Sequence, residues 1–271
     1  MERRHRTVSH RSWDPGQYER YATERAQPFH DLVGLLARDR PVLRMVDLGC
    51  GTGELTAAVV ADLDAAEATG VDSSPEMLER CADHAGPGLR FVEGDLGTWT
   101  SRADHDVVLA NASLHWVANH RSVLARWAAA LAPHGQLAVQ VPANSDHASH
   151  LASVAVAERE PFRAALGPQV PPDPVAANVL RPEEYATVLH ELGFAVQHVR
   201  LQVYPHLLAS TDDVVEWVRG SSLTRFTAVL PPDLHEPFVE AYRRELHDRI
   251  GRRAPYLYTF KRILMWARRG G

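Results

Sequence analysis

The feature that most constrains the fold is residues 44–56, where a short apolar segment runs directly into three closely spaced glycines. Residues 44–48 have the apolar character of a buried parallel strand. The glycines at alternate positions from 49 to 53 let the backbone turn tightly and let a ligand approach where a Cβ would collide. A helical segment follows at 55–61, and its first N–H groups point to the same place. The sequence therefore predicts a nucleotide-ligand cradle at the carboxyl edge of a sheet.

The spacing of these glycines narrows the choice of ligand. A dinucleotide fingerprint has glycine at the first, third and sixth positions, but here Glu54 occupies the sixth position. Asp47 precedes the first glycine by two residues and can accept hydrogen bonds from the loop or from a cationic ligand group. The spacing and Asp47 disfavour an NAD(P) dehydrogenase, and the segment resembles motif I of the class I S-adenosylmethionine (SAM) methyltransferases. The resemblance implies that SAM contacts Asp47, Gly49, Cys50, Gly51 and Gly53.

An alternation of strands and helices follows the glycine turn. Such a βαβ pattern predicts a doubly wound sheet. We expect an α/β, Rossmann-like class I methyltransferase fold: a mostly parallel seven-stranded sheet with helices on both faces and a helical lid. The seven predicted strands are residues 44–48, 68–72, 89–92, 106–110, 136–141, 199–203 and 262–266.

The pattern changes between the last two strands, where residues 211–255 read as helices. Asp233 and Glu236 have the spacing of a capping box that begins one of them. We predict that residues 1–40 form a leader and cofactor-covering helices. Residues 41–210 and 256–271 are predicted to form the SAM-binding core, with 211–255 inserted as a lid.

Composition and charge exclude several classes of protein. The net charge of −5 does not favour a polyanionic partner. No apolar stretch approaches the ~20 residues that span a bilayer, and the basic start of the chain lacks the apolar region of a secretory signal. Two cysteines are too few for a disulfide scaffold. We therefore predict a cytoplasmic protein, a monomer, without nucleic-acid, membrane or metal partners.

Polar residues follow successive predicted strands, where they would meet at the carboxyl edge of the sheet. Asp72 lies roughly 20 positions after Gly53, as in folds where an acid binds the ribose hydroxyls. Asp95 and the backbone near Leu96 could bind the adenine amino group, and Asn111 could lie near the methionine moiety. Each acid alone could equally cap a turn, but the ordered set favours a cofactor site. Ser73 and Met77 are expected near the adenosine, since Met adapts to a flat ring.

The N-terminal region contains Trp13, Tyr18 and Arg25 ahead of the first strand. A helix with these side chains could cover the cofactor, although the aromatic residues could equally belong to the core. The predicted strand at 106–110 ends in Asn111-Ala112-Ser113-Leu114, and not in the Asn/Asp-Pro-Pro-aromatic turn that holds a flipped base. A nucleic-acid methyltransferase is therefore disfavoured.

Several longer segments allow a narrower assignment. They are Trp13-Asp14-Pro15, the turn 47–53, Gly70 to Leu78, Asn111-Ala112-Ser113-Leu114-His115-Trp116 and Leu137 to Pro142, with Trp217-Val218 and Arg262. Together they resemble the trans-aconitate 2-methyltransferases over nearly the whole chain. The resemblance weakens at residues 221–226, where an arginine stands at 225, one position away from the family pattern; this leaves the substrate open and not the reaction type.

The resemblance implies transfer of the SAM methyl group to a carboxylate of a small polycarboxylic acid, which gives a monomethyl ester. A carboxylate is already ionised at pH 7, so no general base is required. Arginine forks suit the remaining carboxylates. The candidate arginines are Arg25, Arg225 and Arg262, and the candidate pocket residues are His115, Trp116, Asn144 and Trp217.

Two other hypotheses remain open. The chain could methylate a hydroxyl group of another small metabolite, with His115 as the general base. It could also bind SAM without turnover, as a sensor or regulatory partner.

Overall fold

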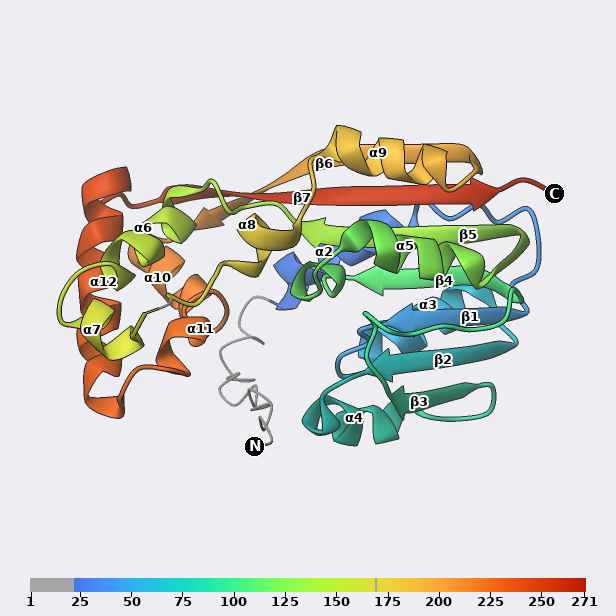
Figure 1. The fold of residues 1–271 in the computed structure, drawn as a ribbon, viewed down its shortest axis with the longest axis horizontal. Coiled ribbons are helices and arrows are strands. Elements are labelled where there is room, and N and C mark those ends of the chain that lie inside the picture. Colours follow the sequence, from blue (N-terminus) through green and yellow to red (C-terminus); the bar gives the residue numbers. More distant parts are fainter. Residues whose placement is uncertain (1–21, 169) are drawn as a thin grey trace, which may run out of the picture. The chain divides into compact units, whose positions relative to one another are not determined.

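A computed structural model describes residues 22–168 and 170–271, with side chains from residue 26 onward. The predictions for Trp13, for Tyr18 and for the side chain of Arg25 therefore lie outside the described residues. Seven strands form one sheet in the order β3-β2-β1-β4-β5-β7-β6 (Figure 1). The strands are β1 (Arg44–Leu48), β2 (Glu67–Asp72), β3 (Leu89–Glu93), β4 (His105–Asn111), β5 (Leu131–Pro142), β6 (Phe194–Leu208) and β7 (Tyr256–Arg269).

Strand direction makes the sheet mixed. β1 pairs in parallel with both β2 and β4, β2 pairs in parallel with β3, and β4 pairs in parallel with β5. β7 runs antiparallel to β5, with Leu264 opposite Gln140 and Arg262 opposite Pro142. All seven predicted strands are present. β6 and β7 extend well beyond 199–203 and 262–266, because the predictions covered only their apolar alternation.

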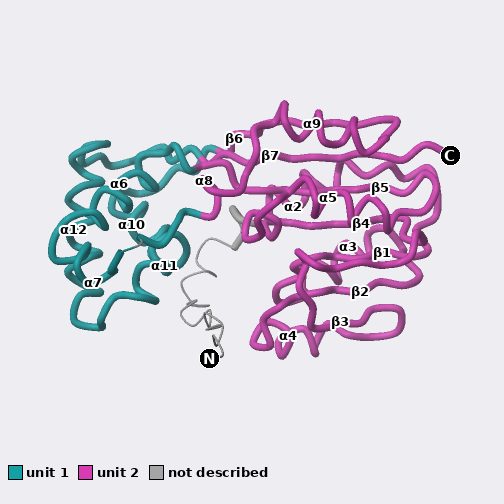
Figure 2. The backbone as a smooth tube through the Cα atoms, in the orientation of Figure 1, with its two compact units in different colours: residues 1–24, 145–173, 205–259 teal, residues 25–144, 174–204, 260–271 magenta. Residues whose placement is uncertain are grey.

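The chain divides into two compact units (Figure 2). Unit 1 comprises residues 1–24, 145–173 and 205–259, and unit 2 comprises 25–144, 174–204 and 260–271. The predicted lid residues 211–255 all fall in unit 1. Residues 145–173, which the sequence analysis placed in the core, group with them.

One face of the sheet in unit 2 is covered by α2 (Ala22–Val33) and α3 (Glu54–Leu63). Leu32 of α2 and Val59 of α3 are buried against Met45, Leu109 and neighbouring side chains of the same face. Alternation along a strand sends Met45 and Asp47 to one face and Val46 and Leu48 to the other. Asp47 therefore projects toward the side that α2 and α3 cover.

The opposite face is covered by α5 (His120–Ala129) and α9 (Pro182–Glu191). Trp127 and Tyr185 from these helices are fully buried with Val46, Leu48 and Val139. The remaining helices of unit 2 are α4 (Pro75–Cys81) and α8 (Pro174–Asn178), with the 3-10 turns η1 (Ala82–His84) and η2 (Leu114–Trp116). Residues 94–104, which connect β3 to β4, contain no helix.

Unit 1 contains the helices α6 (Ala148–Ala157), α7 (Phe162–Leu166), α10 (Asp212–Arg219), α11 (Thr224–Thr227) and α12 (His235–Ile250), and the 3-10 turn η3 (Pro232–Leu234). Its core centres on Phe238 of α12. The ring of Phe238 packs 5.1 Å from that of Phe162 and 5.0 Å from that of Phe226. The predicted capping box is wrong: α12 begins after Leu234 without a side-chain cap, and Asp233 lies in η3.

No helix within residues 22–168 and 170–271 has the length and apolar character needed to cross a membrane. The same residues contain no cluster of three or more His, Cys, Asp or Glu side chains suited to a metal ion.

Candidate functional site

The glycine turn after β1 has three residues in the left-handed region, with φ of +84° at Gly49, +57° at Gly51 and +80° at Gly53. A Cβ on Gly49 would lie 2.2 Å from Cβ of Ser113, and one on Gly53 would lie 2.7 Å from the Phe91 ring. A Cβ on Gly51 would meet no atom within 4 Å. Protein atoms therefore fill the space beside two of these glycines, and only Gly51 leaves room for a ligand.

Asp72 at the end of β2 fixes this loop. One carboxylate oxygen accepts the N–H of Gly51 at 2.9 Å, and the other accepts the N–H of Ser74 at 2.9 Å. A carboxylate has about four acceptor positions, so both oxygens keep capacity for ribose hydroxyls. Ser74 caps α4 by accepting the N–H of Met77 at 3.3 Å, with Pro75 at the first position, as expected for a helix start. Ser73 is exposed beside them.

Asp47 is 3% exposed, and it lies at the base of the same loop. Thr56 donates a hydrogen bond of 2.6 Å to Oδ2 of Asp47. Oδ1 is buried and has no hydrogen-bond partner among the described residues. Burial raises the pKa of Asp47 to about 6, since the charged form is poorly solvated there. A buried oxygen without a donor suits a ligand that brings an N–H or ammonium group.

Two further acceptors belong to the same face of the sheet. Oδ1 of Asn111 at the end of β4 and Oε1 of Gln140 on β5 are also buried without described partners. Asn111 and Gln140 are register neighbours, and Asp47 pairs with Leu109 two residues before Asn111. Side-chain alternation directs all three toward the face that contains Leu109 and Ala138. The sequence analysis missed Gln140 as a site residue, because a single polar residue within an apolar strand gave no signal before β4 and β5 were aligned.

Cys50 lies in the glycine turn and Cys81 ends α4 beside it, and both are buried free thiols. Sγ of Cys81 donates to the carbonyl oxygen of Gly51 at 3.2 Å. Burial raises the pKa of both thiols, that of Cys50 far above its ordinary value. Neither is therefore a nucleophile at neutral pH.

The third strand end serves a local turn. Oδ1 of Asp95 accepts the N–H of Gly97 at 2.7 Å, and the carbonyl oxygen of Leu96 accepts the indole N–H of Trp127 at 3.1 Å. Asp95 is exposed. These bonds give Asp95 the turn-capping role that the sequence left open, and its exposed carboxylate keeps an acceptor for a ligand.

His115 and Trp116 form most of η2, directly after β4. The His115 ring is 7% exposed and lies 4.7 Å from the Trp116 ring, which is 60% exposed. The backbone carbonyl of His115 accepts a hydrogen bond of 2.9 Å from the Asn178 side chain of α8. His115 is thus a fixed wall residue behind an exposed aromatic ring.

Asn144 and Arg262 lie where β5 and β7 meet. Asn144 is fully buried, and its side-chain oxygen accepts the N–H of Lys261 at 2.6 Å. This bond ties the segment after β5 to β7, so the Asn144 oxygen has a structural role. The Arg262 guanidinium lies over the Phe260 ring, 4.4 Å from its centroid.

The other two candidates belong to unit 1. The Arg225 side chain is 11% exposed and forms an ion pair of 3.1 Å with Asp173, while its Nη2 donates to Ser153 at 3.2 Å. His150 pairs with the same Asp173 oxygen at 2.9 Å. The positive charge of Arg225 is therefore paired with the Asp173 carboxylate. Trp217 is 4% exposed and packs between the rings of His206 and Tyr258.

These residues fit SAM, the cofactor that the sequence predicts. Gly51 leaves open space, Asp72 can accept from hydroxyl groups, and the orphaned oxygens of Asp47, Asn111 and Gln140 suit a cationic donor. The cradle lies wholly within unit 2.

The different surroundings of Gly49 and Gly51 give a paired prediction. Gly49→Ala forces a positive φ and a clash with Ser113, so we expect it to destabilise the fold by roughly 3 kcal/mol or more. Gly51→Ala adds only the cost of positive φ, about 1–2 kcal/mol, but its methyl group enters the ligand space. Urea unfolding should rank Gly49→Ala as the less stable variant, whereas calorimetry should show the greater loss of SAM affinity per folded molecule in Gly51→Ala. Unchanged affinity in Gly51→Ala would contradict the assignment of that space.

The raised pKa of Asp47 predicts a pH-dependent stability. Its folded pKa of about 6 exceeds the ordinary value of 3.8, so between these values the folded state binds more protons and stability falls as pH rises. The unfolding free energy of the ligand-free protein relative to Asp47→Asn should fall by about 2–3 kcal/mol between pH 4 and pH 7. Denaturant unfolding of both proteins at several pH values measures this. Parallel stability curves would show that Asp47 has an ordinary pKa.

Comparison with known proteins agrees with this geometry. Residues 45–135 match a family model described as a methyltransferase domain. The chain is 38% identical over 243 residues to the trans-aconitate 2-methyltransferase of Streptomyces avermitilis, which covers 88% of this chain and 89% of that protein. It is 37% identical over 261 residues to that of Mycobacterium tuberculosis, with coverage of 96% and 97%.

A solved structure, the YcgJ protein from Bacillus subtilis, superposes with a TM-score of 0.57 at 16% identity, and covers 89% of this chain and 99% of that one. It shows a shared fold alone. With the methyltransferase-domain match and the mixed seven-stranded sheet, the fold is that of the Rossmann-like class I methyltransferases. At more than a third identity over nearly the full length of its relatives, this chain belongs to the trans-aconitate 2-methyltransferase family.

Proposed function

We propose that this methyltransferase esterifies one carboxylate of trans-aconitate or a closely similar polycarboxylic acid. The observation that carries the proposal is the cradle itself: an open Gly51, Asp72 on the loop and buried unpaired acceptors, in a chain similar to trans-aconitate 2-methyltransferases over 96% of its length. SAM, when bound, supplies a methyl carbon activated by its positively charged sulfur.

The protein's own residues then have two tasks. Those of the cradle hold the donor: Asp72 would accept from the ribose hydroxyls, and Asp47, Asn111 and Gln140 from the ammonium group. The substrate carboxylate is ionised at neutral pH and needs no base, so positioning is the main contribution, worth roughly 7–11 kcal/mol in well-oriented reactions.

Arg262 is the best-supported candidate for holding a substrate carboxylate. It lies in unit 2, opposite Pro142 at the carboxyl end of β5, so the fold places it at the same sheet edge as Asn111. Arg225 is less suited, because Asp173 already neutralises it. Its role is to stabilise unit 1, since a buried charge needs a partner.

We also propose that residues 211–255 act as a lid and select the acid. Trp217 and the aromatic cluster around it give this segment a rigid interior, and His115 and Trp116 form a wall in unit 2. The candidate roles of Trp13, Tyr18 and Arg25 remain proposals drawn from the sequence.

The direct test is a turnover assay with SAM across di- and tricarboxylic acids. We expect release of S-adenosylhomocysteine and a monomethyl ester, identified by mass spectrometry, with trans-aconitate or a near relative as the best acceptor. SAM binding by calorimetry, without turnover on any acid, would favour the sensor hypothesis. Turnover on a hydroxylated metabolite, with a rate that falls at low pH in the wild type but not in His115→Ala, would favour the hydroxyl hypothesis.

Arg262 gives a second prediction. Arg262→Ala should raise KM for the acid at least 10-fold and leave the affinity for SAM unchanged, because it removes a charge-assisted contact to substrate alone. Arg262→Lys should recover part of the loss. Arg268→Ala is the matched control on the same strand, since Arg268 pairs with Asp39 at 2.9 Å. Equal effects of the two alanine variants would remove Arg262 from the substrate site.

A further inference from the structure

A second pocket of about 650 Å³ lies in unit 2, away from the cofactor cradle. Arg44, Glu67, Leu89 and His105 line it, and each is the first residue of its strand, in β1, β2, β3 and β4. The cradle lies at the opposite, carboxyl ends of these strands. Val46 also lines the pocket, on the face opposite to Asp47. The two sites are therefore separated both along the strands and across the sheet.

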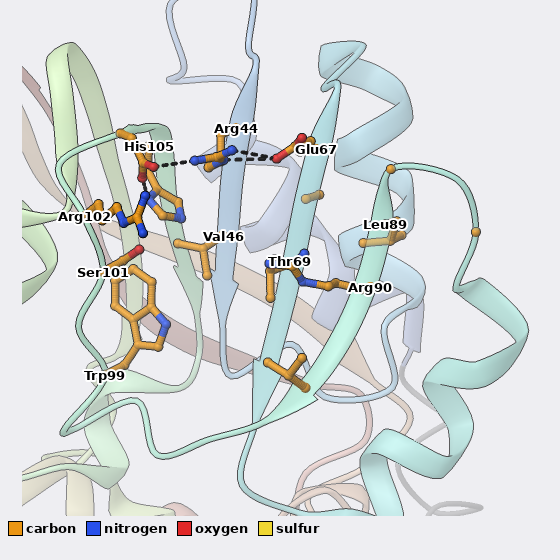
Figure 3. A pocket seen from close by; sticks show the side chains of 15 residues that line it. Arg44, Val46, Glu67, Thr69, Leu89, Arg90, Trp99, Ser101, Arg102 and His105 are labelled. Atoms are coloured by element: carbon orange, nitrogen blue, oxygen red, sulfur yellow. Dashed lines mark hydrogen bonds and ion pairs between the residues drawn. The ribbon is translucent and has the colours of Figure 1, made fainter.

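The pocket exists because α5 and α9 leave the outer part of this face, at β3, uncovered, where Val92 is 39% exposed. Parallel strands normally have helices on both faces, but residues 94–104 pass from β3 to β4 without a helix. Val46 and Thr69 form the floor between two walls (Figure 3). Trp99, Ser101 and Arg102 come from the connecting loop on one side, and Leu89 and Arg90 come from β3 on the other.

One end of the pocket is formed by a cluster of paired charged side chains. Arg44 donates to Glu67 at 2.9 and 3.1 Å and also pairs with Asp104. His105 lies 3.0 Å from Asp104 without the alignment of a hydrogen bond, and its Nδ1 is buried with no hydrogen-bond partner among the described residues. Burial lowers the pKa of His105, so the ring is uncharged at neutral pH. One guanidinium faces two carboxylates, so with His105 uncharged this end carries a net charge of −1, and Arg90 and Arg102 bring the charge of the whole pocket lining to +1.

The walls, in contrast, carry uncompensated positive charge. Arg90 and Arg102 are exposed, and within the described part of the chain neither guanidinium has an ion pair or a side-chain hydrogen bond. The two carboxylates of the pocket, Glu67 and Asp104, are both engaged by Arg44. Trp99 is half-buried and holds its ring edge-to-face with His105, at 5.6 Å between centroids. Two free guanidinium groups thus border an aromatic ring and an apolar floor.

We propose that this pocket binds a small organic anion with a flat apolar body, of the class of aromatic carboxylates. The guanidinium groups of Arg90 and Arg102 bind the carboxylate, since arginine forks match its geometry. The flat body packs on Trp99 and on Val92, whose side chain is exposed in the pocket. The volume falls within the ~300–1,000 Å³ that small-molecule sites occupy. The basic leader of this chain, with Arg3, Arg4 and Arg6, has the wrong sign of charge to fill the pocket itself.

The experiment compares 2-naphthoate with its neutral counterpart 2-naphthamide by calorimetry. The full chain is first saturated with S-adenosylhomocysteine and trans-aconitate, which occupy the cofactor and substrate sites. We expect 2-naphthoate to bind with a stoichiometry of one, and 2-naphthamide to bind at least 10-fold more weakly because it cannot pair with the guanidinium groups.

Variants locate the binding. Arg90→Glu and Arg102→Glu should each weaken 2-naphthoate at least 5-fold and leave 2-naphthamide unchanged, and Arg90→Gln and Arg102→Gln should do so more mildly. Trp99→Ala should weaken both ligands by the same factor. Arg80→Glu is the matched control, because Arg80 is an exposed arginine of α4 outside the pocket. Methyl transfer should be unaffected in all the arginine variants.

Three outcomes would overturn the proposal. Equal affinity for the naphthoate and the naphthamide would show that the guanidinium groups bind no carboxylate. An unchanged naphthoate affinity in both charge-reversal variants would place the ligand elsewhere. Sedimentation showing a wild-type dimer that Arg90→Glu and Arg102→Glu dissociate would identify the surface as an interface between protein chains. Each outcome is independent of whether trans-aconitate is the methyl acceptor.

Discussion

The close approach of the glycine turn to the end of β4 is the constraint on which the cofactor cradle depends. Ser113 occupies the space beside Gly49, and its hydroxyl donates 2.5 Å to the carbonyl of Leu48. Phe91 of β3 fills the space beside both Gly53 and Gly70. Side chains from β3 and from the segment after β4 therefore hold the turn, and the loop keeps its positive φ angles before any ligand arrives. Such preorganisation lowers the entropic cost of binding.

The same region contains an interaction that lowers the stability of the folded protein, the burial of the Asp47 carboxylate. Asp47 is buried with one oxygen unpaired and with a pKa of about 6, so the empty cradle is less stable at neutral pH than its packing alone would give. A bound ammonium group removes that penalty, because it supplies the missing donor and the missing positive charge. Asn111 and Gln140 extend the argument to the neighbouring strands. The unpaired buried oxygens therefore lower the stability of the ligand-free protein and favour the binding of an ammonium group.

Unit 1 contains a cluster of charged side chains that are largely shielded from solvent. Asp173 receives both Arg225 and His150, and these partners hold its pKa well below the usual range despite burial. An arginine held in this way cannot also attract a substrate anion strongly, because the nearby carboxylate cancels its field. The presence of an arginine at a given position is therefore a poor guide to the substrate site. The ion pairs that each guanidinium already makes are a better guide, and they disfavour Arg225.

The sequence by itself determined the sheet and the cradle. Apolar strands, alternate glycines and acids at strand ends are local signals, so β1 kept its predicted bounds, and Asp47, Gly51 and Asp72 lie together as expected. The reach of β6 and β7, the grouping of residues 145–173 with the helices of unit 1, and the cap of α12 depended on contacts distant in sequence. Only the tertiary structure revealed Gln140 beside Asn111, the engagement of Arg225 by Asp173 and the pocket at the outer strands beside Trp99. The physical reason is that burial and pairing belong to neighbours in space, and a chain read in order shows only neighbours in sequence.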